Sequence, residues 1–174
     1  GGHVQAAGLT DGAGGCGDEP VDVDIVCYGL GPFATSARTQ SQLAVVLEVR
    51  RRLSASKCWM YDPVLTPLEV EVLASLGVDM IPDNEEGKRL VTKPTVFIMP
   101  HCPMQLYNNV VWANWGKPLA NVVVVGNSFQ SYDDNVGGAA RTTKLACLLQ
   151  ALPLVHEVPL PAPDNLFMAF NNTR

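Results

Sequence analysis

Short, almost continuously apolar runs alternate along this chain with longer segments that mix apolar and polar residues. Most of these runs are rich in β-branched and aromatic residues, which predicts buried strands. They lie at residues 24–28, 57–61, 78–81, 95–99, 121–125 and 156–160. Proline interrupts the last run, so we expect it to form a strand at the edge of the sheet.

The segments between these runs carry helix signals. Apolar residues recur at helical spacing after Ser36, which is available as a cap, and Thr66-Pro67 is a typical helix start. The polar stretch 84–88 predicts a turn or a short helix. We expect the longer helices at residues 36–53, 66–77, 103–112 and 141–149.

The order of these elements predicts an α/β fold. Continuously apolar strands that alternate with helices are typical of a parallel sheet covered on both faces. We therefore predict a Rossmann-like, doubly wound, mostly parallel sheet with helices on both faces, as a single domain over residues 21–174. Residues 1–20 are rich in glycine and poor in residues that pack, which predicts a flexible tail.

Composition and charge narrow the function classes. Of the 174 residues, 47% are hydrophobic and 17% are charged, an ordinary balance for a folded domain. The net charge of −5 argues against direct nucleic-acid binding. No apolar stretch approaches the ~18–20 residues of a membrane span, and residues 1–20 do not resemble a signal peptide. Five scattered cysteines without a Cys-x-x-Cys pair suit a reducing compartment. We expect a cytoplasmic location, with the nucleus as a second candidate.

In a doubly wound sheet the loops after the strands emerge at one edge, where ligands bind. The most unusual segments of this chain are such loops, at residues 29–33, 62–63, 99–103 and 126–129. We therefore predict that they converge to form a small-molecule site. The predicted binding residues are Gly29, Gly31, Phe33, Asp62, His101, Cys102, Asn127 and Ser128.

The first loop, GLGPFA, matches the relaxed dinucleotide fingerprint Gly-x-Gly-x-x-Ala. Its glycines, Gly29 and Gly31, allow backbone amides to approach a pyrophosphate, and Asp62 would then hold a ribose hydroxyl. However, Pro32 has no amide hydrogen, and Asp62 comes later than the usual ~20 residues after such a loop. The alternative is a glycine turn that only lets strand and helix pack closely.

The third loop, MPHCP, places His101 and Cys102 just before a predicted helix. Cys102 falls near the N-terminus of that helix, where the helix dipole lowers the pKa of a thiol. Three hypotheses stay open: a nucleophile assisted by its neighbour His101, a haem-iron ligand at either residue, or a proline-framed turn without chemistry. A zinc site lacks further ligands at metal spacing, so we predict no metal site other than this haem hypothesis.

Several amide and hydroxyl side chains also call for partners. Asn127 and Ser128 follow the strand at 121–125, where they would orient a polar ligand or cap the loop. Asparagine is unfavourable in a helix, so Asn108 and Asn109 are expected to bond to neighbouring loops or to a ligand.

The ordered set of motifs resembles a known family. CYGLGPF, QLA, YDPV, MPHCP followed by LYNN, and GNSF, between about residues 22 and 135, are similar to the SRR-like domain, named for Sensitivity to Red Light Reduced. The resemblance implies a regulatory protein linked to circadian-clock gene expression and, in animals, to the regulation of haem biosynthesis. It carries over no catalytic residue. The haem link favours the haem hypothesis for His101 and Cys102, and an indirect link to that pathway stays open.

We therefore expect a regulator of biological rhythms and haem biosynthesis that binds a small ligand, nucleotide-like or haem, at the carboxyl edge of its sheet. Protein partners are compatible with this role. A second hypothesis is a cofactor-dependent enzyme that uses a nucleotide or methyl donor with His101 or Cys102, so the question of catalysis stays open. A third is an interaction protein whose cleft no longer binds a ligand.

Overall fold

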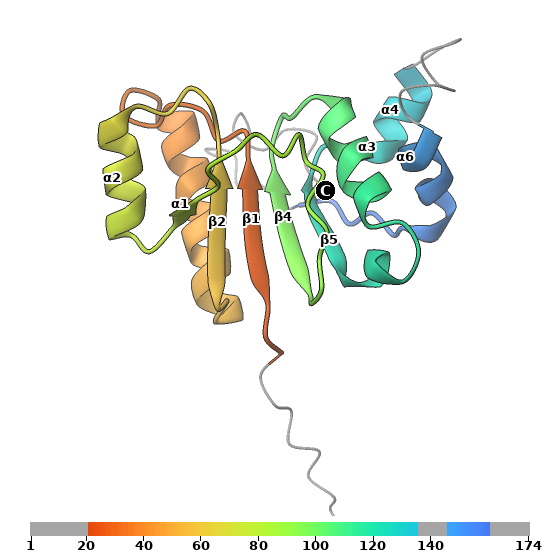
Figure 1. Ribbon diagram of the computed structural model, residues 1–174. Coiled ribbons are helices and arrows are strands. Elements are labelled where there is room, and N and C mark those ends of the chain that lie inside the picture. The colour runs from red at the N-terminus through yellow and green to blue at the C-terminus, as the bar shows by residue number, and fades with distance from the viewer. Residues whose placement is uncertain (1–20, 136–145, 161–174) are drawn as a thin grey trace, which may run out of the picture.

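A five-stranded, all-parallel sheet forms the centre of the molecule in this computed structural model, which describes residues 21–135 and 146–160 (Figure 1). The strands are β1 (Asp24–Tyr28), β2 (Lys57–Tyr61), β3 (Asp79–Met80), β4 (Thr95–Met99) and β5 (Val122–Gly126). Their order in the sheet is β3-β2-β1-β4-β5, and every neighbouring pair is parallel. The predicted doubly wound fold is confirmed. The strand order reverses between β1 and β4, which is the usual ligand position in such sheets.

Helices cover both faces of the sheet. The described helices are α1 (Ala37–Leu53), α2 (Pro67–Ser75), α3 (Met104–Ala113), α4 (Phe129–Asn135), α6 (Ala146–Ala151) and the short 3-10 helices η1 (Lys117–Asn121) and η2 (Leu152–Leu154). Figure 1 shows α1 behind the sheet and α3 in front of it. Side chains of α1 and α2 pack into one hydrophobic core, and those of α3, α4 and α6 pack into a second core on the opposite face.

The predicted helix signals act as expected. Ser36 caps α1, and its side chain accepts a hydrogen bond from the amide of Thr39. Thr66 and Glu69 form a reciprocal capping box at the start of α2, with Pro67 in the first turn. These local signals explain why both helices begin where the sequence predicts.

The segment at residues 81–94 covers the second face of the sheet over β1 and β2, where a doubly wound fold usually places a helix. It crosses in front of these strands in Figure 1. Ile81 and Val91 belong to the core beneath it, and the Arg89 guanidinium lies 5.3 Å from the centre of the Trp59 ring. A segment without regular structure therefore forms one wall at the carboxyl end of the sheet.

Four sequence expectations need correction or fall outside the described chain. Residues 156–160 form no strand, although they are described, and residues 129–135 form α4, where the sequence predicted no helix. The helix expected at 141–149 is described only from Ala146, as α6. The expectation of a flexible tail over residues 1–20 lies outside the described residues. None of the described helices is long and apolar enough to cross a membrane.

Candidate functional site

The loops that follow β1, β2, β4 and β5 meet at the carboxyl edge of the sheet, as their place after parallel strands predicts. The loop after β1 is bonded to the loop after β2 by the Gly31 amide, which donates to Asp62 Oδ2 at 2.7 Å. The Cys102 thiol donates to the Tyr28 carbonyl at 3.2 Å, and the His101 amide donates to Asn127 Oδ1 at 3.2 Å. Hydrogen bonds thus connect all four loops.

Three amides of the glycine loop, those of Gly31, Phe33 and Ala34, are already paired with carboxylates of the protein itself. Asp62 accepts from Gly31, and Oε1 of Glu69 accepts from the amides of Phe33 at 2.6 Å and Ala34 at 2.8 Å. These are the donors that a dinucleotide pyrophosphate would need. The positions predicted to hold phosphate therefore hold two carboxylates.

Glu69 is a buried acid, only 2% exposed, that links α2 to the glycine loop. Its Oε2 accepts from the amide and the hydroxyl of Thr66 at 2.9 and 2.8 Å. Hydrogen bonds from the Thr66 amide, and next from the Ala34 amide, lower the pKa of Glu69 to about 2. The Glu69 carboxylate is thus charged at neutral pH, and it occupies the position at these amides where a bound anion would otherwise lie.

Asp62 is held in the same way. Its Oδ1 accepts from the Val64 amide at 3.0 Å while Oδ2 binds Gly31. Both oxygens therefore organise the backbone, and this arrangement favours a turn-forming role over the ribose contact that the dinucleotide hypothesis assigned to Asp62.

The expectation of a lowered pKa at Cys102 is wrong. The thiol is 5% exposed, Pro103 rather than Cys102 occupies the N-cap of α3, and burial raises the pKa of Cys102 to about 12. A thiolate is the form that attacks substrates or binds iron. The geometry therefore weighs against Cys102 as a nucleophile or haem ligand. His101 is exposed, with a backbone φ of 60°, on the turn beside it.

Asn127 and Ser128 also bond within the protein. Asn127 donates from Nδ2 to the Tyr132 hydroxyl at 2.8 Å, in addition to its bond with the His101 amide. Ser128 donates to Glu157 at 2.7 Å, and the same carboxylate accepts from the amide of Phe129, the first residue of α4, at 2.6 Å. Both residues hold loops and the start of α4 in place.

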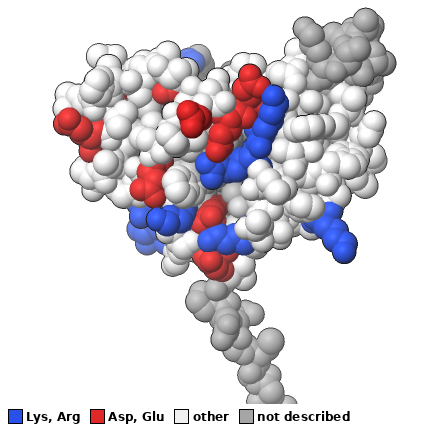
Figure 2. Space-filling view, viewed as in Figure 1, with Lys and Arg blue, Asp and Glu red and all other residues white. Residues whose placement is uncertain are grey.

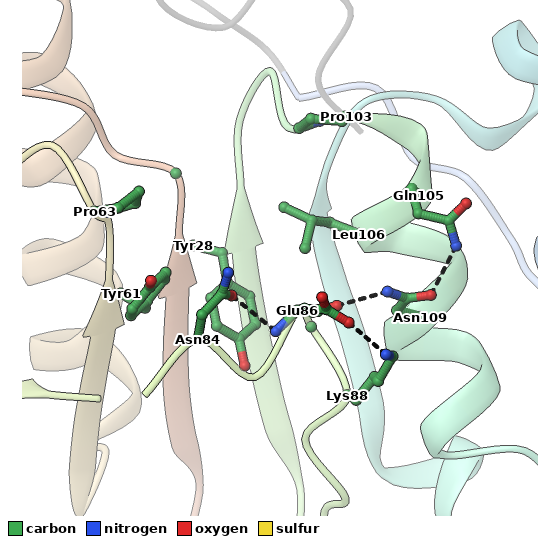
Figure 3. A pocket seen from close by; sticks show the side chains of 12 residues that line it. Tyr28, Tyr61, Pro63, Asn84, Glu86, Lys88, Pro103, Gln105, Leu106 and Asn109 are labelled. Carbon is green, nitrogen blue, oxygen red and sulfur yellow. Dashed lines mark hydrogen bonds and ion pairs between the residues drawn. The ribbon is translucent and has the colours of Figure 1, made fainter. Parts of the chain in front are cut away.

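A hollow of about 580 Å³ opens beside these loops, between the carboxyl ends of β1 and β2, the 81–94 segment and the start of α3 (Figure 3). Its position adjoins the reversal of strand order between β1 and β4. It is lined by Tyr28, Gly29, Tyr61, Pro63, Asn84, Glu86, Gly87, Lys88, Pro103, Gln105, Leu106 and Asn109.

One part of this hollow is aromatic and aliphatic. Tyr28 and Tyr61 are the last residues of β1 and β2 and lie opposite each other in the strand pairing. Leu106 projects from α3 toward the Tyr28 side of the hollow in Figure 3. This arrangement suits contact with a flat ring.

The polar part of the hollow is tied together by hydrogen bonds. Asn109 donates to the Glu86 carbonyl at 2.7 Å and accepts from Gln105 at 2.8 Å. The Asn84 side chain accepts from the Glu86 amide at 3.0 Å. Asn109 therefore finds the neighbouring-loop partner that its place in a helix required, and it fixes the wall at residues 84–88.

Charges in and behind this wall occur in pairs. Lys88 forms an ion pair with Glu86, and Arg89 binds Glu85 through two hydrogen bonds of 2.9 and 2.8 Å. The Tyr28 hydroxyl donates to Glu85 at 2.8 Å, and burial, followed by this bond, raises the pKa of Tyr28. Figure 2 shows acidic and basic groups side by side over the middle of this face. Each pair joins one positive and one negative side chain, so these pairs give the lining no net charge.

Among the predicted binding residues, Gly29 lines the hollow, while the other seven lie on the four loops but do not line it. The sequence did not indicate Tyr28, Tyr61 and Leu106 as lining residues. Two sequence features could have indicated the polar wall of the hollow. They are the unusual polar stretch at 84–88 and the asparagines of α3.

The chain is similar to known proteins along most of its length. The SRR1 domain family matches residues 18–174. An SRR1-like protein from Mus musculus is 47% identical over 118 residues, which cover 66% of this chain and 47% of the mouse protein. Protein SENSITIVITY TO RED LIGHT REDUCED 1 from Arabidopsis thaliana is 35% identical over 157 residues, covering 87% of this chain and 57% of the plant protein.

The relatives are longer than this chain. An SRR1-like protein from Drosophila melanogaster is 35% identical over 107 residues, which cover 61% of this chain and 39% of the fly protein. The chain thus spans about half the length of the mouse and plant relatives that it matches. No solved structure matches it.

Proposed function

This chain belongs to the SRR1 domain family, and we propose that it is a regulatory protein whose activity responds to a small molecule bound in the hollow between the ends of β1 and β2 and the start of α3. The name of the plant relative refers to sensitivity to red light. We place the chain in the same kind of process, the control of clock-linked gene expression and of haem biosynthesis, within the cytoplasm and nucleus and together with protein partners.

The observation that carries this proposal is the hollow itself. Its volume of about 580 Å³ lies within the range of small-molecule sites, roughly 300–1,000 Å³. It adjoins the reversal of strand order, where ligands of doubly wound sheets bind. Its walls combine two tyrosines and Leu106 with a few amide side chains, a combination typical of ligand sites.

The contacts at the edge favour a sensor over an enzyme. Cys102 donates its hydrogen to a carbonyl and is buried, and neither Cys102 nor His101 lines the hollow. A nucleophile needs an activated, accessible form next to its substrate. The proposal therefore assigns no catalytic residue and no iron ligand at Cys102, and the link to haem biosynthesis acts at the level of regulation.

A variant that fills the hollow tests the proposal. Leu106→Trp adds bulk inside the hollow, and the matched control Leu68→Trp adds the same bulk on α2, where Leu68 is 67% exposed. Each protein is incubated with a cell metabolite extract, and bound molecules are identified by native mass spectrometry. Wild type and Leu68→Trp should retain a ligand that Leu106→Trp loses.

Thermal unfolding gives a second measurement for the same set. A ligand present at 100 times its Kd should raise the free energy of unfolding by about 2.7 kcal/mol in wild type and in Leu68→Trp. In cells that lack their own SRR1-like protein, the control should restore the regulated response and Leu106→Trp should not. Full rescue by a folded Leu106→Trp protein would exclude a role for the hollow.

A further inference from the structure

We infer that the ligand of this hollow is an uncharged, ring-bearing molecule without a phosphate group, because the protein has filled the phosphate position of its glycine loop with its own carboxylates. The inference rests on the proposed function and names the chemical class that the hollow accepts. It reverses the nucleotide hypothesis that the GLGPFA pattern suggested.

Four amides of the loop donate to acceptors within the protein. Gly29 donates to the Tyr61 carbonyl at 3.2 Å, and Gly31 donates to Asp62. Phe33 and Ala34 donate to Glu69. Pro32 has no amide hydrogen to donate. A phosphate that bound these amides, as in dinucleotide-binding loops, would therefore displace the buried Glu69 carboxylate from its hydrogen bonds.

Charge opposes such a phosphate as well. Glu69 keeps its negative charge down to a pH of about 2, and it is 2% exposed, so water screens it poorly. Asp62, on the loop after β2, is bonded to the glycine loop through the Gly31 amide. Two carboxylates beside an incoming phosphate repel it, and no cation on the loop offsets them, since residues 29–34 contain no lysine or arginine.

The hollow has the chemistry of a neutral ring site instead. Tyr61 offers a ring surface and Leu106 offers an aliphatic one, while Tyr28 also lines the hollow but is only 3% exposed. Its one lysine, Lys88, is paired with Glu86 and supplies no net charge for an anion. Burial of a ring against these side chains gains affinity without requiring a charged partner.

Matched pairs of probes test the inference on the unmodified protein. Adenosine is compared with AMP, and riboflavin with FMN, by calorimetry and by thermal unfolding. We expect the neutral member of a binding pair to bind at least about tenfold more tightly than its phosphate ester. The ligand captured from the metabolite extract should contain no phosphorus by mass and by ³¹P NMR.

The outcomes separate the inference from the proposed function. A captured phosphate ester, or a probe pair in which the ester binds as well as the neutral member, overturns the inference while the hollow remains a binding site. If no molecule is captured and no probe binds, the proposed function fails and the inference fails with it.

A second experiment examines the filled phosphate position without any ligand in the hollow. Glu69→Ala removes the carboxylate and frees the amides of Phe33 and Ala34. Inorganic pyrophosphate should then raise the Tm of Glu69→Ala more than that of wild type, with sodium chloride at equal ionic strength as the control. Equal shifts in both folded proteins would contradict the assignment. Should the variant not fold, the probe pairs on wild type decide.

Discussion

Asn114 ties the 81–94 segment to the end of α3, and Asn114→Ala tests whether side-chain hydrogen bonds hold that wall of the hollow. The side chain is fully buried. It accepts from the Val91 amide at 2.8 Å and donates to the carbonyls of Arg89 and Val110 at 2.9 Å. Alanine at this position keeps the backbone of the helix end but cannot form these three hydrogen bonds.

The expected cost follows from the groups that lose their partners. A buried donor or acceptor left without a hydrogen bond costs about 1–3 kcal/mol. The Val91 amide bond is buried, while the Arg89 carbonyl is partly exposed and regains water. We therefore expect Asn114→Ala to lower the free energy of unfolding by about 2–4 kcal/mol. For a chain of this size a loss of about 3 kcal/mol lowers the Tm by roughly 6–12 °C.

Urea unfolding measures the loss, and hydrogen exchange locates it. The amide of Val91 should exchange faster in Asn114→Ala, together with its neighbours in the 81–94 segment. Gln150→Ala is the matched control, because Gln150 is an exposed amide side chain on α6 and should change stability by less than about 0.5 kcal/mol. If Asn114→Ala behaves like this control, apolar packing of Ile81 and Val91 alone holds the segment and the reasoning is refuted.

Two further predictions concern the loops at the carboxyl edge. Gly29 and Gly116 both have positive φ, +69° and +91°, but only at Gly29 would a Cβ lie 2.7 Å from the Cys102 sulfur, with nothing within 4 Å at Gly116. Gly29→Ala should therefore lower the free energy of unfolding, measured in urea, by about 1–3 kcal/mol more than Gly116→Ala does. Adding Cys102→Ala to Gly29→Ala should recover part of that difference. Equal costs for the two glycine variants would show that the contact is unimportant. Burial raises the pKa of Cys102 from its usual value of about 9 to about 12, so the unfolded chain releases this proton first as the pH rises. The stabilisation from the buried thiol should be complete below about pH 9 and be lost between about pH 9 and 12, with a smaller decline in Cys102→Ala; identical pH profiles would contradict the burial of Cys102 as a neutral thiol.

The fold was predictable because its signals are local. The apolar runs at β1, β2, β4 and β5 became strands, and the caps at Ser36 and Thr66 became helix starts. Continuous apolar strands also require cover on both faces, which leads to a parallel doubly wound sheet. Residues 156–160 were misassigned because strand propensity cannot show whether a neighbouring strand offers a free edge for pairing.

The position of the hollow, but not its lining, follows from the sequence. Loops after parallel strands share one edge of a sheet and the hollow opens at that edge, but Gly29 alone of the eight predicted binding residues lines it. The glycine loop, however, has the same sequence pattern whether its amides bind a phosphate or a protein carboxylate. Glu69 had a local signal only as a capping-box residue, and nothing in the sequence indicated that its second oxygen reaches Phe33 and Ala34.

The amino-acid sequence by itself determined the strands, the helix starts, the order of elements and the edge at which the unusual loops gather, because these depend on neighbours a few residues apart. Only the tertiary structure decided what those loops bind. The partners of Gly31 and Phe33 lie 31 and 36 residues away along the chain, and a hydrogen bond depends on distance in space. The same packing bonded amides of the dinucleotide-like loop to carboxylates of the protein. It also left a hollow between the ends of β1 and β2 and α3.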